Sequence, residues 1–508
     1  MIKSNGGIIG PDNVTTGGPF GTASGVFKLG EVTDLIKDSK WPTAGPGGHQ
    51  VANSCRFNDG SSDNLSKTPS GDGSRVKWTW SGWVKRCSLG HQPIFSTPGN
   101  SSNIYDEFYF NSTDKIQFSA VVSGTQYALR TKRQFRDFSA WYSIVLIFDS
   151  NNSTASDRMQ LWINGVRTAE ADLEDITFKD AQNYNSATNK SGYVTYIGRV
   201  TTNSAAYYDG YMSEVAFQND SATTPVDKFG EFNSVTNIWV PKDISGLTFG
   251  TNGSYLDFKD SSALGNDAAG SNNFTANNLT AIDQSTDTCT NNFATWNSLI
   301  KTTATFSEGN LKYAQPGSNP VFGSLSTIGV TSGKWYAELN YTSGSSHKLV
   351  LGVADETFQN GNTTSSYDLG KSGTTSSIAY VVNTGAYRIN NSNTSWGSAG
   401  GDGQIIMWAI DKVNNKIYFG VNGVWGASSN PASNSGGIPT TALDSSTDWF
   451  IGCTNDTSGT ETVAQFNFGS PPFAISSGNT DGNGYGNFEY AVPSGYYALN
   501  TKNLAEYG

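Results

Sequence analysis

The chain has 508 residues, enough for more than one domain, of which only 15% are charged, 36% are hydrophobic and 57 are glycine. Much Gly, Ser, Thr and Asn with little Lys or Glu disfavours helices and favours short strands joined by polar turns. A net charge of −11 without a long run of Lys or Arg argues against nucleic acid as a partner. Trp and Tyr (13 and 23 copies) spread over the whole length argue against disorder.

Residues 1–50 are rich in Gly and Pro, with one amphipathic stretch. Val32, Leu35 and Ile36 have the spacing of a short helix that ends before Pro42. Such a segment cannot fold alone, so we expect it, with Trp41, to dock on another protein or subunit. No apolar run long enough for a signal peptide or a membrane span occurs, so we expect neither cleavable export nor membrane insertion.

Residues 51–225 have the pattern of an all-β domain. "VKWTWSGWVKR" alternates apolar and polar residues, and "WYSIVLIFD" (141–149) is a continuous apolar run, as in a central strand. "MQLWINGVRT" (159–168) predicts a hairpin whose two-residue turn is Asn164-Gly165.

Residues 226–300 are polar and rich in turns, but aromatic residues recur in them, so we expect an ordered connector and not a flexible linker. Within it, "LTFGTNGSYLDF" (247–258) predicts a hairpin with a turn at Asn252-Gly253. Residues 301–508 return to the all-β pattern with "GKWYAELNY", "IIMWAID", "KIYFGVNGVW" and "WFIGC".

The two β-rich regions repeat one order of elements. A buried strand ends on Asp149 or Asp411, and an alternating strand follows and turns at Asn164-Gly165 or Asn422-Gly423. An aromatic-Ile-Gly strand and a last strand ending in Phe come next in both regions. The order predicts an all-β protein with two tandem jelly-roll sandwiches.

The first region resembles laminin-G-like domains of the concanavalin A-like fold, through "WTWSGWVKR", "WYSIVLIFD", "MQLWINGVR" and "GYMSEVAF". The last resembles a SPRY domain, through "GKWYAELNY", "LGVAD", "GDGQIIMWAIDKVNNKIYFGVNGVW" and "FNFGSPPF". The N-terminal segment and the connector resemble segments of virion proteins of marine tailed phages.

These resemblances imply a virion structural protein, made in the host cytoplasm, that acts as a tail fibre or appendage. The N-terminal segment would dock to other virion proteins, and the sandwiches would bind a glycan or protein on the host surface. Assembly into a homo-oligomer, such as a trimer, is compatible with this role. A decorating fibre on the capsid and a polysaccharide depolymerase are the alternatives.

Carboxylates offer little support for catalysis. Glycosidases need two converging carboxylates, but the pairs Asp106-Glu107 and Asp355-Glu356 are adjacent, so on a strand their side chains point to opposite faces. Glu214 and Glu338 stand alone, and we expect them on solvated strand faces. We therefore predict no catalytic residue and no enzymatic activity.

Metal and nucleophile motifs are also missing from the sequence. Residues 479–490 begin like a calcium loop, but Glu489 falls at position 11 and no helices flank the loop, so a surface turn is expected. We predict no cofactor; calcium at a sandwich rim stays open without a ligand set. The cysteines lack CxxC spacing, and the histidines lack a nucleophile motif: Cys55, Cys87, Cys289, Cys453, His49, His91 and His347.

Aromatic residues in polar loops are the candidate ligand contacts. Trp396, Trp425, Tyr207 and Tyr208 lie next to loops rich in Gly, Asn and Ser, a setting suited to stacking on sugar rings. A packing role at the sandwich edge is the alternative for both tryptophans.

Overall fold

The computed structural model describes residues 48–200, 206–219, 225–234, 236–300, 304–316, 323–343, 349–358, 368–371, 376–455 and 461–508. These fall into two compact units, one ending at Thr290 and the other running from Asn291 to Gly508. The predicted docking residues Val32, Leu35, Ile36 and Trp41 lie outside the described residues.

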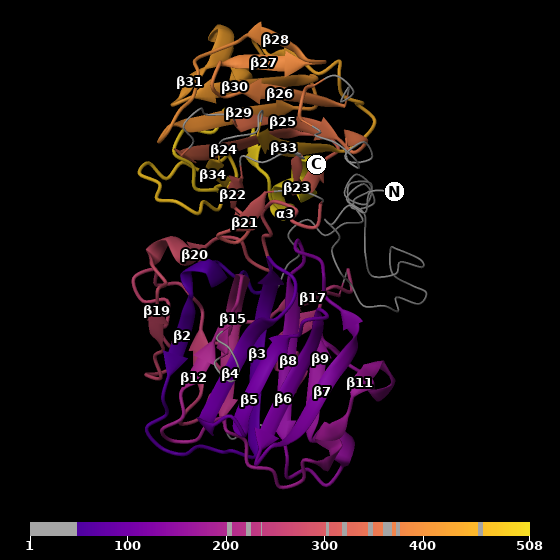
Figure 1. Ribbon diagram of the computed structural model, residues 1–508, viewed down its shortest axis with the longest axis vertical. Coiled ribbons are helices and arrows are strands. Elements are labelled where there is room, and N and C mark those ends of the chain that lie inside the picture. The colour runs from indigo at the N-terminus through magenta and orange to yellow at the C-terminus, as the bar shows by residue number, and fades with distance from the viewer. Residues whose placement is uncertain are drawn as a thin grey trace. The chain divides into compact units, whose positions relative to one another are not determined.

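The first unit is a sandwich of two sheets, drawn from indigo to pink in Figure 1. One sheet, called here the first hairpin sheet, runs in the order β10 (Val166–Arg167), β9 (Met159–Ile163), β8 (Tyr142–Asp149), β3 (Lys77–Arg86), β15 (Gly210–Asn219), β1 (Ser54–Phe57) and β20 (Gln284–Ser285), and β18 (Ser254–Leu256) also pairs with β15. The opposite sheet runs β11 (Leu173–Asp175), β7 (Thr125–Gln134), β6 (Lys115–Val122), β5 (Ile104–Phe110), β4 (Gln92–Ser101), β12 (Thr195–Ile197), β2 (Asn64–Lys67) and β19 (Thr275–Asn277).

The second unit is also a sandwich of two sheets. Its hairpin sheet runs β31 (Val424–Trp425), β30 (Lys416–Val421), β29 (Ile405–Asp411), β24 (Lys334–Ser343), β34 (Thr462–Asn467), β22 (Lys312–Gln315) and β21 (Thr305–Ser307), with β32 (Ile438–Pro439) on β30 and β35 (Tyr497–Ala498) on β24. The opposite sheet runs β28 (Ser392–Ser395), β27 (Ala386–Ile389), β26 (Ser377–Val381), β25 (Leu349–Asp355), β33 (Trp449–Asn455) and β23 (Ser324–Val330). A short helix, α3 (Thr501–Tyr507), ends the chain.

The two sandwiches share one strand order. Read from the hairpin, β10-β9-β8-β3-β15-β1-β20 corresponds strand by strand to β31-β30-β29-β24-β34-β22-β21. In the opposite sheets, β7-β6-β5-β4-β12-β2 corresponds to β28-β27-β26-β25-β33-β23. The predicted all-β fold class is confirmed, and the shared order accounts for the repeat seen in the sequence.

The central strands β8 and β29 are held at one end by equivalent ion pairs. Asp149 at the end of β8 lies opposite Lys77 in register, with Nζ and Oδ2 3.4 Å apart. Asp411 at the end of β29 lies opposite Lys334, with the same atoms 3.0 Å apart. The terminal Asp of each apolar run therefore pairs with the Lys that opens the neighbouring strand.

The other ends of these strands are held by the turn asparagines. Asn164 Oδ1 accepts a hydrogen bond from the Ser143 N–H of β8 at 2.9 Å, and Asn422 Oδ1 accepts one from the Ile405 N–H of β29 at 2.9 Å. Both asparagines have positive φ (49° and 47°), as the two-residue turn requires. The asparagine thus forms the turn and also closes the ladder of the central strand.

An aromatic ring from the segment that covers each hairpin sheet packs against the turn glycine. A Cβ on Gly165 (φ 75°) would lie 2.1 Å from the Trp239 ring, and one on Gly423 (φ 83°) would lie 2.9 Å from the Tyr490 ring. Trp239 Nε1 also donates to Ser143 Oγ at 3.1 Å. Glycine is therefore required twice over at these turns, by conformation and by contact.

Both central strands are buried on both faces. In β8, Ile144, Leu146 and Phe148 face the sandwich core, while Val145 and Ile147 pack on a second cluster with Phe229, Ile244, Phe249 and Tyr255. In β29 the odd positions Met407 and Ala409 pack on Phe488, Tyr496 and Ala498. The segments after each sandwich's last long strand thus serve as a third layer over the hairpin sheets.

The expected connector 226–300 is shared between the two units. Residues 226–290 add β18, β19 and β20 to the first sandwich, together with the β-ribbon β16 (Gly230–Phe232) and β17 (Trp239–Pro241), while Ala294 and Trp296 belong to the second core. The hairpin expected at 247–258 is wrong, because Ser254–Leu256 pairs with β15 and neither Asn252 nor Gly253 has positive φ.

Buried ion pairs fasten the end of this segment to the first sandwich. Lys85 on β3 donates to Asp287 at 2.7 Å, both side chains being almost fully buried, and Trp141 Nε1 donates to the same carboxylate at 3.1 Å. Arg56 on β1 lies 3.5 Å from Asp283. The last part of the first unit is therefore fixed by buried charges.

The glycine of the turn gives a first prediction. Gly165→Ala should destabilise the protein by roughly 1–2 kcal/mol for the left-handed conformation and a further 1–3 kcal/mol for displacing Trp239. Gly124→Ala has nearly the same φ (81°) and open space around its Cβ, so only the first cost applies. Urea unfolding should rank the two variants in that order; equal losses would contradict the contact with Trp239.

The buried pair gives a second prediction. Asp287→Asn leaves the Lys85 ammonium buried without its carboxylate and should cost about 3–5 kcal/mol of unfolding free energy. Glu170→Gln breaks the exposed pair with Lys179 and should cost less than about 1 kcal/mol. Thermal and urea unfolding measure both; a small effect at Asp287 would show that the pair does not fasten the segment.

Candidate functional site

The outer face of the sheet opposite the first hairpin sheet carries tyrosines and polar residues. On β5, Tyr105, Glu107 and Tyr109 alternate with Asp106, Phe108 and Phe110, which point into the sandwich. On β12, Thr195 and Ile197 line an interior cavity, so Tyr196 between them points outward. We call this outer surface, with Tyr105, Tyr109, Tyr196, Arg199 and Tyr207, the tyrosine face.

An arginine held between two tyrosine rings is the distinctive feature of the tyrosine face. The Arg199 guanidinium carbon lies 4.8 Å from the Tyr196 ring centroid and 5.5 Å from that of Tyr207. Arg199 opens β13 (Arg199–Val200), and Tyr207 closes β14 (Ala206–Tyr207), which is paired with it. Gly198, at φ 77°, makes the bend that takes the chain from β12 into β13.

The Arg199 guanidinium has no carboxylate partner within ion-pair distance among the described residues, and its Nε has no hydrogen-bond acceptor there. By contrast, Arg130, farther along the same face, lies 3.7 Å from Glu174 and 4.0 Å from Asp175. Stacking on two rings orients the planar group while leaving its outer N–H groups unused. Arg199 is therefore a positioned, unneutralised cation in a chain of net negative charge.

A row of hydroxyl side chains crosses the sheet beside this arginine. The register aligns Thr275, Ser66, Tyr196, Ser96, Glu107 and Ser119 on neighbouring strands. Ser96 Oγ donates to the Arg199 carbonyl at 2.7 Å, which ties β13 to β4. Tyr105 and Tyr109 flank Glu107 along β5, and burial raises the pKa of Tyr109 to about 12, so its hydroxyl stays protonated.

The tyrosine face differs from the outer faces of the other three sheets. Apolar clusters cover the two hairpin sheets, as described above, and a third cluster with Leu325, Val350, Phe358, Leu369 and Phe450 covers the sheet containing β25. Among the described residues no comparable apolar cluster lies on the tyrosine face. Its polar and aromatic surface is therefore the one best suited to contact a ligand.

Of the predicted ligand contacts in the first sandwich, Tyr207 lies on the tyrosine face and is half-buried. Tyr208 is fully buried, packs edge-on against Phe57, and donates its hydroxyl to the Lys85 carbonyl at 2.9 Å. A role for Tyr208 in stacking on a sugar is therefore wrong, because successive residues of an extended segment face opposite sides.

The two tryptophans of the second sandwich do not form a joint site. Trp396 is 9% exposed and donates Nε1 to the Phe419 carbonyl at 3.0 Å, so its ring belongs to the core and offers no free face. Trp425 is half-buried against Tyr336 and Tyr418, with ring centroids 6.3 and 6.5 Å apart. The packing alternative holds for Trp396, and ligand contact by Trp425 stays a prediction.

The expectation of solvated positions for Glu338 and Glu214 is wrong. Glu338 is fully buried and accepts hydrogen bonds from the Tyr336 hydroxyl (2.7 Å) and from the N–H groups of Glu489 and Tyr490 (both 2.8 Å). Burial raises the pKa of Glu338, and these donors oppose that rise. Glu214 is 5% exposed and accepts from the Tyr255 hydroxyl at 2.7 Å. Both carboxylates fasten covering segments.

The adjacent acids Asp106 and Glu107 point to opposite faces, as predicted. Asp106 is fully buried and accepts from the Thr188 N–H at 2.7 Å and from the hydroxyls of Ser186 and Tyr184. Burial raises the pKa of Asp106. Glu107 lies in the hydroxyl row on the outer face. The two cannot share one substrate.

The calcium-like loop has a structural role in the described fold. Asp481 Oδ1 accepts from the N–H groups of Asn483 and Tyr485, and Oδ2 accepts from the Ala498 N–H and the Asn503 amide. With four N–H donors, this carboxylate is committed to fixing the C-terminal segment.

Three further features concern metals, thiols and membranes. The described part of the chain holds no group of three His, Cys, Asp or Glu side chains arranged for a metal ion. None of the four cysteines forms a disulfide, and burial raises the pKa of each thiol. No described helix has the length and apolarity needed to cross a membrane.

Tyr105, Tyr109, Tyr196 and Arg199 are not among the residues predicted from the sequence. The alternation in "YDEFYF" (105–110) places two tyrosines and a glutamate on one face and two phenylalanines on the other, which is the signal of a polar outer face. Arg199 lies in "YIGR", a stretch whose pattern indicates only the repeated aromatic-Ile-Gly strand. Tyr207 lies on another strand, so its contact with Arg199 cannot be predicted without knowing that β13 and β14 pair.

The match to a protein family agrees with the architecture of the first sandwich. Residues 59–225 match a family model, Laminin_G_3, described as the concanavalin A-like lectin/glucanases superfamily. Solved structures similar to parts of the chain include the SPRY domain of human HERC1 (12% identity, 34% of this chain and 96% of that chain, TM-score 0.26). Another is the native heptameric SAP-like pentraxin from Limulus polyphemus (13% identity, 39% and 100%, TM-score 0.28).

A search of curated proteins found no match to the chain. The family match spans the first sandwich from β2 to β15 and so includes every strand of the tyrosine face except β19. Over residues 59–225 the chain is therefore similar to concanavalin A-like lectins and glucanases, within an all-β protein of sandwich domains.

Proposed function

We propose that this protein is an adhesin that binds an acidic glycan on the tyrosine face of its first sandwich. The observation that carries the proposal is the Arg199 guanidinium, held between the Tyr196 and Tyr207 rings without a carboxylate partner among the described residues. The match to a family that includes lectins supports the same class of ligand.

A carbohydrate fits the chemistry of this face. Half-buried tyrosine rings offer flat apolar surfaces to the C–H groups of a sugar, and their hydroxyls can donate and accept hydrogen bonds. Of the hydroxyl row, Thr275 is exposed and Ser66 is half-buried, and these two add small hydroxyl groups at the edge of the face. Strands already fix the positions of these groups, so the protein loses little conformational entropy when a ligand binds.

The cation specifies an acidic sugar. A guanidinium pairs with a carboxylate or sulfate through two parallel hydrogen bonds, a geometry that the flanking rings already favour. The chain as a whole carries a net charge of −11, which repels polyanions at a distance. Binding of an acidic glycan should therefore depend on Arg199 and strengthen with added salt until the local pair itself is screened.

Within this proposal the protein is a virion component, a tail fibre or appendage of a tailed phage that contacts the host surface. The support is the resemblance of the N-terminal and connector sequences to those of phage virion proteins. A capsid fibre remains the alternative, and antibody labelling of virions would separate tail from capsid. A depolymerase is disfavoured by the opposite orientations of Asp106 and Glu107.

Variants of the tyrosine face give the third prediction. Arg199→Gln should weaken binding of an acidic polysaccharide by about tenfold or more, since a charged hydrogen bond is worth roughly 1.5–3 kcal/mol, and should spare a neutral one. Tyr207→Ala should weaken both about fivefold or more. Arg167→Gln, which removes an exposed arginine paired with Asp157, is the matched control. Immobilised polysaccharides and the full chain provide the assay.

The outcomes separate the parts of the proposal. Equal losses for acidic and neutral polysaccharides on Arg199→Gln would reject the acidic ligand while keeping the glycan site. No loss in any tyrosine-face variant, with binding retained, would place the site elsewhere. Failure of the purified protein to bind susceptible host cells and to compete with infection would reject the adhesin.

A further inference from the structure

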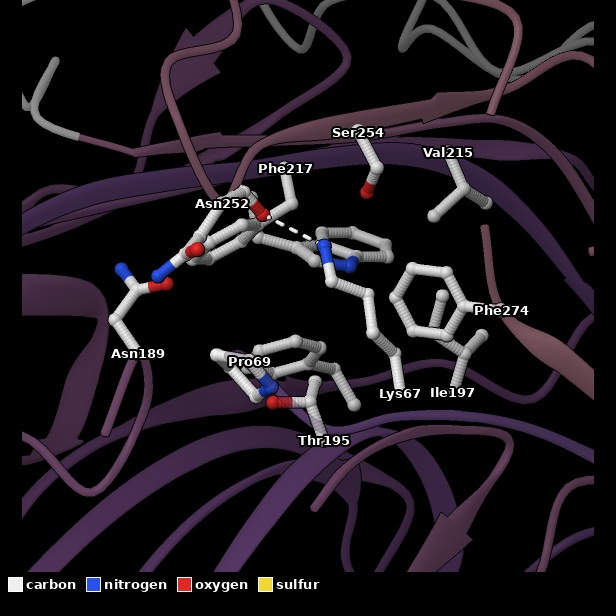
Figure 2. Close-up of a pocket in the computed structure, with 12 residues that line it drawn as sticks. Lys67, Pro69, Asn189, Thr195, Ile197, Val215, Phe217, Asn252, Ser254 and Phe274 are labelled. Atoms are coloured by element: carbon white, nitrogen blue, oxygen red, sulfur yellow. Dashed lines mark hydrogen bonds between the residues drawn. The ribbon is translucent and has the colours of Figure 1, made fainter. Parts of the chain in front are cut away.

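Two basic side chains of the first sandwich lie in different surroundings, and the proposed function uses neither. Lys67 extends into a small interior cavity between the two sheets, where Nζ donates to the Asn252 carbonyl at 2.9 Å (Figure 2). This cavity has room for about one water molecule, so it holds no site for a larger ligand. His49 instead lies beside carboxylates of the first hairpin sheet and of its covering segment, residues 226–256.

One of these carboxylates belongs to Glu214, which lies in a β-bulge of β15. The pairing of β15 with β3 shifts register between Ser213 and Ala216, and Glu214 has a φ of 50°. A non-glycine residue rarely adopts this conformation inside a strand, and bulges commonly redirect a side chain that has a role. The Glu214 side chain is 6% exposed, and its Oε2 lies 3.5 Å from His49 Nε2 and accepts from the Tyr255 hydroxyl at 2.7 Å.

Three parts of the first unit meet at this carboxylate. His49 belongs to the start of the unit, Glu214 to its last long strand, and Tyr255 to the covering segment. Two residues after His49, the Val51 N–H donates to the Thr290 hydroxyl at 3.1 Å. His49 also comes shortly after the predicted docking residues in the sequence, so a change at His49 acts on the chain directly after them.

Pairing with the carboxylate changes how readily His49 holds a proton. The hydrogen bond with Glu214 raises the pKa of His49 above its ordinary value of 6.5, and the charge of Asp243 adds to the rise. Burial and the charge of Lys259 oppose the rise without reversing it. The folded protein therefore binds this proton more tightly than the unfolded chain does.

The other titratable groups of this cluster keep their charge state near neutral pH. Hydrogen bonds from a neighbouring serine lower the pKa of Asp243, which stays a carboxylate, and burial raises the pKa of the Tyr255 hydroxyl, which stays protonated. Burial also raises the pKa of the nearby Cys289 thiol. Lys259 lies in an ion pair with an aspartate of its own segment. The charge that follows the pH here is therefore that of His49.

We infer that His49 and Glu214 form a pH-sensitive clasp, which fastens the start of the first unit to β15 and its covering segment when His49 is protonated. As an imidazolium, His49 forms a charge-assisted pair with a carboxylate that burial has deprived of most of its water. As a neutral imidazole it offers at most an uncharged hydrogen bond, about half as strong. The stabilisation is complete below the unfolded pKa of about 6.5 and is lost as the pH rises through the higher folded pKa.

Titration of the histidines in the full chain tests the clasp. The chain has three histidines, so ¹³C labelling gives few ring signals, and His49→Gln identifies the signal of His49. Its midpoint should lie above about 6.5, and Glu214→Gln should bring it back to about 6.5 or below, because burial then acts without the paired carboxylate. Glu231→Gln, which breaks an exposed pair with Lys242, is the matched control and should leave the midpoint unchanged.

Hydrogen exchange of the full chain gives an independent readout. After correction for the intrinsic effect of pH, protection of residues 49–53 should fall about threefold or more between about pH 5.5 and about pH 8.5. In His49→Gln the protection should be low at both values. His91→Gln should keep the parent profile, because His91 packs edge-on against Tyr109 of β5, with ring centroids 4.9 Å apart.

The clasp is overturned by a His49 midpoint at or below about 6.5, or by an unchanged midpoint in Glu214→Gln. Protection of residues 49–53 that is independent of pH in the parent, or unaltered in His49→Gln, would overturn it as well. If Glu214→Gln does not fold, the parent titration and the exchange profile of His49→Gln decide. None of these outcomes bears on glycan binding at the tyrosine face.

Discussion

The central strands β8 and β29 are buried on both faces, and this double burial determines how each sandwich is built. A strand such as β8, with all eight residues buried, cannot be satisfied by one sandwich core. Every second side chain of such a strand points away from the sandwich core, and these apolar side chains stay in water unless a second apolar layer covers them. Residues 226–256 provide that layer in the first unit, and the C-terminal residues Phe488–Ala498 provide it in the second.

The same constraint explains the buried polar contacts of the covering segments. A covering loop has few ladder hydrogen bonds, so carboxylates on the sheet capture its backbone and hydroxyl groups instead. Glu338 accepts two backbone N–H groups from the C-terminal segment, and Glu214 accepts the Tyr255 hydroxyl from residues 226–256. Residues that could suggest catalysis are therefore part of the architecture, and candidates for function have to come from uncovered surface.

Among the outer faces of the four large sheets, only the tyrosine face, on the sheet with β5 and β12, is polar and carries aromatic rings without an apolar cover in the described residues. Its tyrosines are fixed by strand register, and its arginine is fixed by two rings. A surface built in this way is prepared for a ligand before the ligand arrives, which is the physical basis of the proposed adhesion. The second sandwich repeats the strand order without this feature, since apolar residues occupy its corresponding face.

Much of the fold could be predicted from the sequence because its signals are local. Asn164-Gly165 and Asn422-Gly423 specify their turns, and the apolar runs ending on Asp149 and Asp411 specify central strands. The site could not, because its contacts are not local: Tyr196 and Tyr207 reach Arg199 only once β13 and β14 pair. The burial of Glu338 has no local sequence signal, because its donors lie 151 and 152 residues away. Tyr208 is not distinguished from Tyr207 by the sequence, because loop composition does not reveal which of two adjacent rings points inward.

Hydrogen–deuterium exchange of the full chain with a saturating acidic oligosaccharide would locate the bound glycan. We expect slowed exchange in Tyr196–Val200 and Ala206–Tyr207, lost in Arg199→Gln, with no change in β28 or β31. Protection confined to β28, β31 or other parts of the second sandwich would contradict it, because the ligand would then be held where the structure places packed tryptophans.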